Sequence, residues 1–278
     1  MVQTKQKHGN GQIVTMSNIL KLTANKTLLS RAALILSLTS AIFLIAPEID
    51  IWFSRLFYSP ADGFWLKDDT FPTRLRALGL FLPRVIIICL LLFSLARLLW
   101  PKLRSIFPLT KIIYLIGTAT IGPGLLVNGI LKANWGRARP VQTDLFGGHW
   151  PYSEVWVIAN NCKSNCSFVS GEASMAFWLI GLVILLPMGW RKVGLWIIAS
   201  LTSLVSLNRI AFGAHYLSDI LIGWSLTGLV MALMLLLFDK LGLFSERSDK
   251  IEKYWDKSGL WLRTRGKMLL SRLLNRDN

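Results

Sequence analysis

Three short polar segments of this sequence, residues 132–140, 168–172 and 208–219, each lie beside a long apolar segment. Together they contain lysine, arginine, serine, glycine, histidine and aspartate. These residue types suit phosphoryl transfer, because its transition state spreads negative charge over three oxygens that cations and amides can bind. Each segment alone has an ordinary structural explanation. Their joint occurrence predicts one site for phosphoryl transfer.

The candidate phosphate ligands come from all three segments. Lys132 and Arg139 are separated by six residues, and Arg209 lies in the third segment. Such cations often only anchor a helix at the membrane surface, but guanidinium groups also bind phosphate oxygens in pairs. Ser170 and the amide of Gly171 precede an apolar segment, where a helix start is capped by serine and favours an anion. We expect these five residues to bind phosphate.

The candidate nucleophile is His215. Neutral imidazole attacks phosphorus through one ring nitrogen when the other nitrogen is held. Asp219 follows four residues later, so on a helix the two side chains share one face. We expect Asp219 to accept a hydrogen bond from the histidine and to stabilise the imidazolium. The alternative is a purely structural hydrogen bond.

The spacing of these residues resembles a known signature. Lys132-x6-Arg139-Pro140, Ser170-Gly171 and Arg209-x5-His215-x3-Asp219 are similar to the three motifs of the type 2 phosphatidic acid phosphatase superfamily, which includes vanadium haloperoxidases. The resemblance implies a phosphohistidine at His215 and no metal or other cofactor. It implies phosphate binding by Lys132, Arg139, Ser170, Gly171 and Arg209.

The second motif departs from the family pattern. The family usually has Pro-Ser-Gly-His, whereas this chain ends the motif with Glu172, and Asn208 replaces a serine in the third motif. The usual acid for the leaving group is therefore missing. Glu172 is one candidate acid and His149 another; a diphosphate substrate would need no acid, because phosphate leaves as a stabilised anion. A catalytically impaired chain is the remaining alternative.

The elements that must position these residues are membrane-spanning helices. The chain is 53% hydrophobic and 17% charged, with a mean hydropathy of +0.49, and its apolar residues form blocks near the length that crosses a bilayer. The blocks are about 32–46, 78–99, 112–131, 173–188, 193–207 and 217–238. We expect an all-α bundle of six transmembrane helices, with a kink at Gly122-Pro123-Gly124 in the third.

The charges between the blocks indicate the orientation. The chain divides into a basic tail (1–31), a six-span domain (32–238) and a second basic tail (239–278), which is either an amphipathic helix on the membrane or disordered. Most of the 31 lysines and arginines lie in segments that share one side. The positive-inside rule then predicts cytoplasmic termini in a bacterial inner membrane and an active site at the periplasmic face.

Two cysteines lie in the loop predicted to be periplasmic. Cys162 and Cys166 are four residues apart, and an oxidising compartment favours a disulfide between them. A metal site is not expected, since two further ligands at suitable spacing are missing. The net charge of +16 does not indicate nucleic-acid binding, because no solvated basic domain is present. The expected partners are the bilayer and a lipid phosphate, with no obligate protein partner evident.

The expected function is hydrolysis of a lipid phosphomonoester. A site at headgroup depth, under a loop rich in aromatic residues (Phe146, Trp150, Tyr152, Trp156), suits a lipid phosphate. The Ser-Gly-Glu motif and the cysteine-containing loop resemble bacterial lipid A phosphatases. Alternatives are an undecaprenyl diphosphate phosphatase, a lipid phosphotransferase that uses the same histidine, and a non-enzymatic lipid-binding or transport protein. The last is disfavoured because the spans contain almost no charges that could line a conducting path. Arg84 and Arg97 lie near span ends, where they are expected to snorkel.

Overall fold

The computed structural model describes residues 6–7, 13–14 and 16–274 of the chain. Its regular structure is almost entirely helical, which confirms the predicted all-α fold class. The longer helices are α1 (Met16–Ile45), α2 (Glu48–Arg55), α3 (Thr70–Leu99), α4 (Leu109–Ala119), the π-helix η2 (Thr120–Leu131), α6 (Gly171–Trp178), the 3-10 helix η5 (Leu179–Leu185), α7 (Arg191–Ala211), α8 (Leu217–Lys240) and α9 (Ser248–Leu274).

The shorter elements lie between the long helices. The strands among the described residues form two antiparallel hairpins, β1 (Gln6–Lys7) with β2 (Ile13–Val14) and β3 (Tyr58–Ser59) with β4 (Gly63–Phe64). The short helical turns are η1 (Pro101–Ser105), α5 (Lys132–Asn134), η3 (Pro140–Gln142), η4 (Asp144–Phe146) and η6 (Met188–Trp190).

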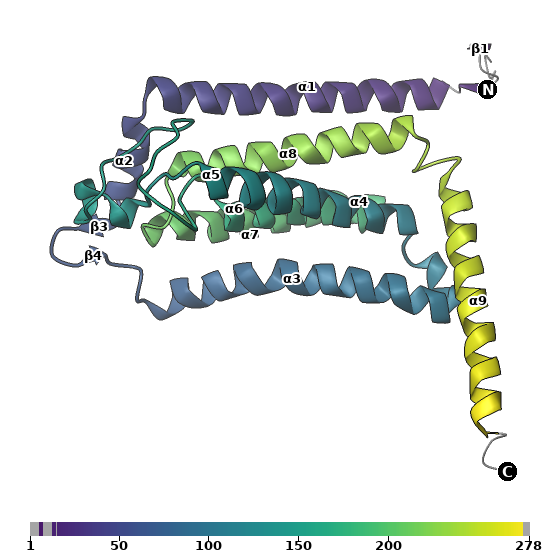
Figure 1. Ribbon diagram of the computed structural model, residues 1–278. Helices are drawn as coiled ribbons and strands as arrows, with labels where there is room; N and C mark the ends of the chain where they lie inside the picture. Colours follow the sequence, from purple (N-terminus) through teal and green to yellow (C-terminus); the bar gives the residue numbers. More distant parts are fainter. Residues whose placement is uncertain (1–5, 8–12, 15, 275–278) are drawn as a thin grey trace.

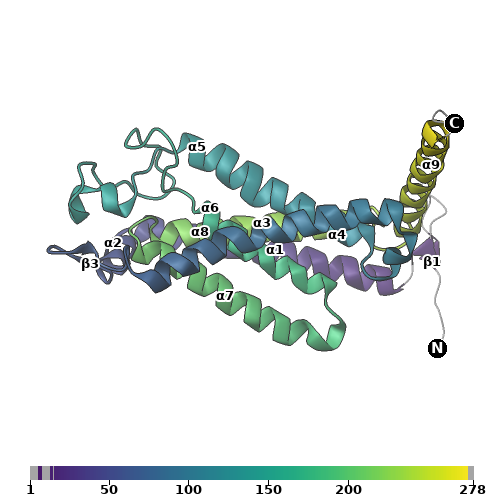
Figure 2. The same ribbon diagram turned by 90° about the horizontal axis from the view of Figure 1, so that it is seen from below.

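The long helices run side by side in an elongated bundle (Figure 1). Helix α8 lies within it and contacts α1, α4, α6 and η2. Hairpin β3–β4, helix α2 and the loop 135–170 gather at one end, here called the loop end (Figures 1 and 2). Near this end, a buried apolar cluster that includes Val127, Phe168, Val169 and Ile222 joins η2, the loop and α8. This packing fixes the elements that carry the polar segments.

Five helical segments are long and apolar enough to cross a membrane. They are Leu22–Ile45, Thr70–Leu99, Leu109–Asn134, Met188–Ala211 and Leu217–Lys240. The block expected as the fourth span is instead a shorter apolar helix, Gly171–Leu185. It ends there because Leu186 precedes Pro187, and the residue before a proline avoids helical backbone angles. The count of six spans stays a prediction.

The expected irregularity in the third block is a π-helix. Pro123 has no backbone N–H, so the helix cannot keep a regular hydrogen-bond pattern through it. The side-chain amide of Asn128 donates to the Pro123 carbonyl at 2.6 Å, which satisfies one of the displaced acceptors. This change in the helical hydrogen-bond pattern ends directly before Lys132, where the first polar segment begins.

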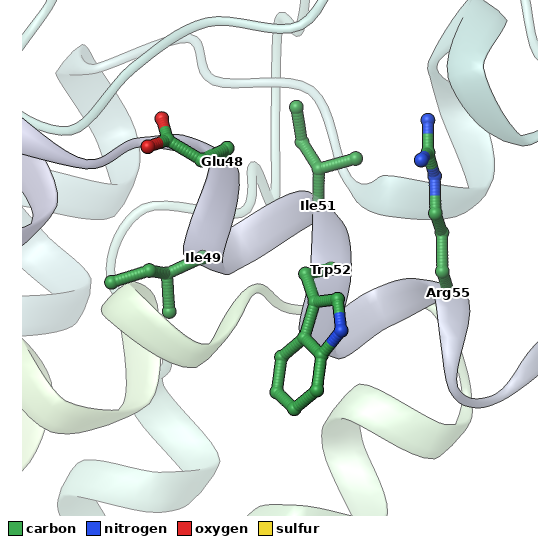
Figure 3. Close-up of a pocket in the computed structure, with 5 residues that line it drawn as sticks. All are labelled: Glu48, Ile49, Ile51, Trp52 and Arg55. Atoms are coloured by element: carbon green, nitrogen blue, oxygen red, sulfur yellow. The ribbon is translucent and has the colours of Figure 1, made fainter.

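Helix α2 presents two different faces at the loop end. Its outer face forms a shallow depression lined by Glu48, Ile49, Ile51, Trp52 and Arg55 (Figure 3). Its inner face buries Asp50 and Ser54. An amphipathic helix of two turns thus delivers one carboxylate into the protein interior.

At the opposite end, helix α9 lies across the bundle (Figure 1). Trp255 donates its indole N–H to the Ser94 carbonyl at 3.1 Å, and the Leu109 amide donates to Glu252 at 2.6 Å. Arg97, expected to snorkel, is instead buried and forms an ion pair with Glu252. The predicted second tail therefore contains a docked helix, and the first contains the start of α1 at Met16.

Candidate active site

His215 lies in the turn between α7 and α8 and is almost completely buried. Its Nδ1 atom is 2.8 Å from the carbonyl oxygen of Ser167. Burial lowers the pKa of His215 to about 4, and the charges of Arg209 and Lys132 act in the same direction, although Asp219 opposes them. The ring is therefore neutral at physiological pH. Because Nδ1–H donates to a carbonyl, the lone pair is on Nε2, the nitrogen suited to attack.

Asp219 supports the histidine less directly than its spacing predicts. Its Oδ2 atom is 3.7 Å from the His215 Nδ1 atom and accepts hydrogen bonds from the Ser167 hydroxyl at 2.5 Å and the Tyr216 amide at 2.9 Å. The physical reason is that α8 begins only at Leu217, so His215 precedes the helix and does not share its face with Asp219. Ser167 therefore connects the two groups.

A fully buried arginine, which the sequence reasoning did not single out, neutralises the carboxylates of this region. The Arg137 guanidinium is 2.7 Å from Asp219 Oδ1 and 2.9 Å from Asp50 Oδ2. Asp50 also accepts a hydrogen bond from the Ser218 amide at 2.8 Å. In the sequence, only the position of Arg137 within the first polar segment, residues 132–140, could have indicated that it belongs to the site. Its partner Asp50 lies on helix α2, far away in the sequence, and no sequence pattern marks it.

Arg209 is the most deeply buried of the three expected cationic phosphate ligands. It lies in the last turn of α7 and is 2% exposed. Its Nε atom is 3.2 Å from Glu172 Oε2, outside hydrogen-bond geometry. Nε and Nη1 are buried and have no hydrogen-bond partner among the described residues. Each of these two donors can bind an oxygen of a phosphate group.

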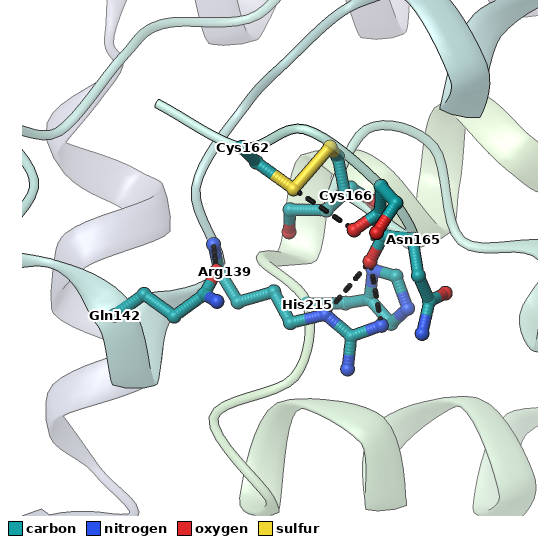
Figure 4. The surroundings of a disulfide bond; sticks show 8 residues. Arg139, Gln142, Cys162, Asn165, Cys166 and His215 are labelled. Carbon is teal, nitrogen blue, oxygen red and sulfur yellow. Dashed lines mark hydrogen bonds between the residues drawn. A yellow bond between two sulfur atoms is a disulfide. The ribbon is translucent and has the colours of Figure 1, made fainter. Parts of the chain in front are cut away.

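Arg139 and Lys132 flank the same region. Arg139 donates from Nε and Nη2 to the carbonyl oxygen of Asn165, at 3.2 and 2.8 Å (Figure 4). Lys132 is half-buried, and it interacts electrostatically with Arg139, Arg209 and Glu172. The structure thus brings together the three expected cations, which come from the first and third polar segments.

Ser170 and Gly171 begin helix α6, as expected. The Ser170 hydroxyl accepts a hydrogen bond from the Ala173 amide at 3.3 Å, and the Ser170 amide donates to the Asp219 carbonyl at 3.1 Å. A side chain at Gly171 would meet Asn128, since a Cβ atom there would lie 2.2 Å from its Oδ1 atom. Glycine is therefore required where α6 and η2 approach one another.

Glu172 forms ion pairs with two arginines. Besides Arg209, its carboxylate contacts Arg76 on α3, with Oε1 3.8 Å from Nη2. Arg76 was not identified from the sequence, because nothing in α3 distinguishes it from an interfacial anchor.

The other two sequence candidates lie elsewhere. His149 is exposed, and its backbone amide donates to the Gln142 carbonyl at 2.9 Å. Asn208 donates to the Pro72 carbonyl at 2.8 Å and so ties the end of α7 to the start of α3. Asn208 therefore has a structural contact, and nothing places His149 over His215.

Cys162 and Cys166 form a disulfide that closes a small loop (Figure 4). Asn165, which binds Arg139, lies inside this loop, and Ser167, which holds His215, follows it directly. The disulfide thus limits the movement of two residues that orient the site. The aromatic residues expected to roof the site have other contacts. Phe146 packs against Tyr58 and Phe64, whereas Tyr152 accepts a hydrogen bond from Arg137 at 3.2 Å.

No group of three or more histidine, cysteine, aspartate or glutamate side chains in the described part of the chain could hold a metal ion. A cavity of about 260 Å³ adjoins the polar residues. Its lining includes Gly79, Leu80, Arg84, Lys132, Glu172 and Met175.

Comparison with known proteins indicates the family of this chain. The model of the PAP2 superfamily matches residues 108–243, which contain all three polar segments. The chain is 39% identical over 212 residues to the lipid A 4'-phosphatase of Rhizobium leguminosarum, covering 71% of this chain and 90% of that protein. The chain belongs to the PAP2 superfamily. The resemblance that the motifs indicated is confirmed.

Other relatives have similar descriptions. The lipid A 4'-phosphatase of Francisella tularensis subsp. novicida (strain U112) is 38% identical over 181 residues, covering 64% of this chain and 81% of that protein. Among solved structures, a transmembrane PAP2 type phosphatidylglycerolphosphate phosphatase from Bacillus subtilis has a TM-score of 0.45 and 20% identity, covering 78% of this chain and 96% of that one. A likeness of this size carries no conclusion about the fold.

Some site residues lie outside the segment that the PAP2 model matches. Asp50, Arg76 and Arg84 all precede residue 108. The matched segment holds the nucleophile and the expected cations, whereas α2 and α3 add a buried carboxylate and two arginines around it.

Proposed function

We propose that this membrane phosphatase hydrolyses the phosphomonoester of a lipid A-like lipid through a phosphohistidine on His215. The observation that carries the proposal is the buried, neutral His215, whose Nδ1 atom is held by Ser167 and whose Nε2 atom is the free nucleophile. Relatives described as lipid A 4'-phosphatases, at 39% and 38% identity, support the substrate class. The apolar helices support a substrate that reaches the site from a bilayer.

In the first step, the lipid phosphate binds among Lys132, Arg139 and Arg209. The two unpartnered donors of Arg209 bind phosphate oxygens, and the other cations balance the remaining charge. The Nε2 atom of His215 forms a bond to phosphorus while the bond from phosphorus to the lipid oxygen breaks. Asp219 and the Ser167 carbonyl stabilise the positive charge that develops on the ring.

The leaving lipid oxygen needs a proton, and Glu172 is the group we assign to it. In the free enzyme its carboxylate is paired with Arg209 and Arg76. A bound phosphate competes for Arg209 and puts negative charge beside Glu172, which favours uptake of a proton from solvent by the Glu172 carboxylate. The proton then passes to the lipid alkoxide.

In the second step, water attacks the phosphohistidine. Glu172, now ionised, accepts a proton from the water as its oxygen bonds to phosphorus and the bond from phosphorus to Nε2 breaks. Inorganic phosphate leaves and His215 is neutral again. Side chains supply all the positive charge in this scheme, so we propose that the reaction is independent of metal.

We place the loop end at the periplasmic face of a bacterial inner membrane, with both tails in the cytoplasm. The disulfide supports a periplasmic location of the loop end, because such bonds persist in oxidising compartments. The excess of lysine and arginine in the tails supports the orientation.

The purified protein is expected to release phosphate from a lipid A 4'-phosphate in detergent micelles, with little change after treatment with EDTA. The measurement is free phosphate together with mass spectrometry of the lipid product. Undecaprenyl diphosphate is the comparison substrate. A clear preference for the diphosphate, or loss of activity with EDTA, would contradict the proposal.

The Glu172→Gln variant is expected to lose about a hundredfold or more of kcat on the lipid phosphomonoester and far less on undecaprenyl diphosphate. A sugar alkoxide needs a proton, whereas phosphate leaves as a stable anion. The control is the His149→Gln variant, which removes the other candidate acid. Equal losses on both substrates would show that Glu172 only holds Arg209 and Arg76 in place.

A further inference from the structure

Arg84 lies in an unusual place for an arginine. It is the fifteenth residue of α3 (Thr70–Leu99), about 21 Å along the helix from its first residue at 1.5 Å per residue. It was expected to reach the headgroups from a span end, and the apolar segment that could cross a membrane, Thr70–Leu99, continues on both sides of it. A charge within such a segment is costly, and such residues usually serve a function.

No hydrogen bond or ion pair joins Arg84 to another residue that the structure describes. Two arginines that are buried in the protein differ from Arg84 in this respect. Arg97 is paired with Glu252, and Arg137 is paired with Asp50 and Asp219. Arg84 is therefore available to a group that does not belong to the protein.

The environment of Arg84 is the cavity beside the phosphate site. Arg84 lines this cavity together with Lys132 and Glu172, while Leu80 and Met175 supply apolar wall. Helical side chains tilt toward the N-terminus of their helix, and the N-terminus of α3 is at the loop end (Figure 1). The side chain of Arg84 thus extends toward the loop end and the site.

The cavity is too small to take a whole lipid. Its volume is about 260 Å³, below the usual range for small-molecule sites of roughly 300 to 1,000 Å³. It can hold the phosphate and the first atoms beneath it, so the chains must stay in the bilayer. The group that meets Arg84 is therefore the linkage between headgroup and chains.

The chemistry of this linkage separates the two candidate substrate classes. In an acylated lipid phosphate, ester or amide carbonyl oxygens lie just below the phosphate, and they are hydrogen-bond acceptors. In a prenyl phosphate, the hydrocarbon chain begins directly at the phosphate oxygen. A guanidinium group has five N–H donors and no acceptor, so it matches carbonyl oxygens and gains nothing from a hydrocarbon chain.

We propose that Arg84 binds the ester or amide carbonyl oxygens of the substrate's acyl linkages and thereby selects acylated lipid phosphates. The proposal rests on the proposed function, since it places the phosphate among Lys132, Arg139 and Arg209. Arg84 is a specificity residue and takes no part in the transfer to His215.

The test compares two synthetic substrates that differ only in their linkages. One is a glucosamine 4-phosphate with two ester- or amide-linked chains, and the other has the same chains in ether linkage. The variant is Arg84→Met, which keeps an unbranched, flexible side chain and removes every donor. The matched control is Arg74→Met, an exposed arginine on the same helix.

We expect Arg84→Met to lower kcat/KM about tenfold on the acyl substrate and less than twofold on the ether substrate, because only the acyl compound loses hydrogen bonds to a charged donor. Activity on the ether substrate also shows that the variant is folded. Arg74→Met should leave both values unchanged.

The outcomes distinguish this inference from the proposed function. If the wild-type protein cleaves both compounds and Arg84→Met lowers both equally, or neither, the role of Arg84 is overturned and the function stands. If the wild-type protein cleaves neither compound, the proposed function fails and the inference fails with it.

Discussion

The His215→Ala variant is expected to release phosphate from lipid substrates at least about 10⁴-fold more slowly than the wild-type protein. The reason is that Nε2 of His215 is the atom that bonds to phosphorus, and no other described nucleophile takes its position. The Ser167 carbonyl already holds the ring at Nδ1, so the nucleophile is oriented before substrate binds. The measurement is phosphate release in detergent micelles at saturating lipid, to isolate kcat.

A matched control separates loss of the nucleophile from general damage. His149→Ala removes an exposed histidine of the same face and is expected to keep full activity. A second measurement traps the intermediate: brief incubation with a radiolabelled lipid phosphate followed by alkaline quenching should label the wild-type protein and not His215→Ala. Phosphate release retained by His215→Ala would rule out the phosphohistidine mechanism.

The sequence predicted the parts of the site that lie within single segments. Ser170 and Gly171 start a helix in the structure because a serine cap followed by an apolar run specifies that locally. The end of the same helix was placed too late, at residue 188, although Pro187 and the residue before it contain the signal for an earlier stop.

Contacts between distant segments could not be predicted in this way. Asp50 and Arg76 come from α2 and α3 and reach the site only after the bundle packs. The link between His215 and Asp219 was predicted from helical spacing, but α8 begins two residues after the histidine, and the carbonyl of Ser167 makes the hydrogen bond instead. Spacing indicates proximity only where the helix itself includes both residues.

The Arg137→Met variant is expected to lower the apparent melting temperature in detergent by about 10 °C or more. Removing one partner of a buried ionic network leaves the other charges uncompensated, at a cost of about 3 to 5 kcal/mol. Here two carboxylates, Asp50 and Asp219, lose the guanidinium that lies 2.9 and 2.7 Å away. The measurement is thermal unfolding followed by fluorescence of a thiol-reactive or intrinsic probe.

Arg139→Met is the matched control, since Arg139 is two residues away and only half-buried, with both hydrogen bonds to one loop carbonyl. It should lose activity and keep its melting temperature to within a few degrees. The double variant Arg137→Met with Asp50→Asn removes one of the two uncompensated carboxylates, so it should be more stable than Arg137→Met alone. A double variant that is less stable than the single one would contradict this prediction. It would show that Ser218, and not Arg137, stabilises the Asp50 carboxylate, so that Arg137 does not link helix α2 to Asp219 and His215.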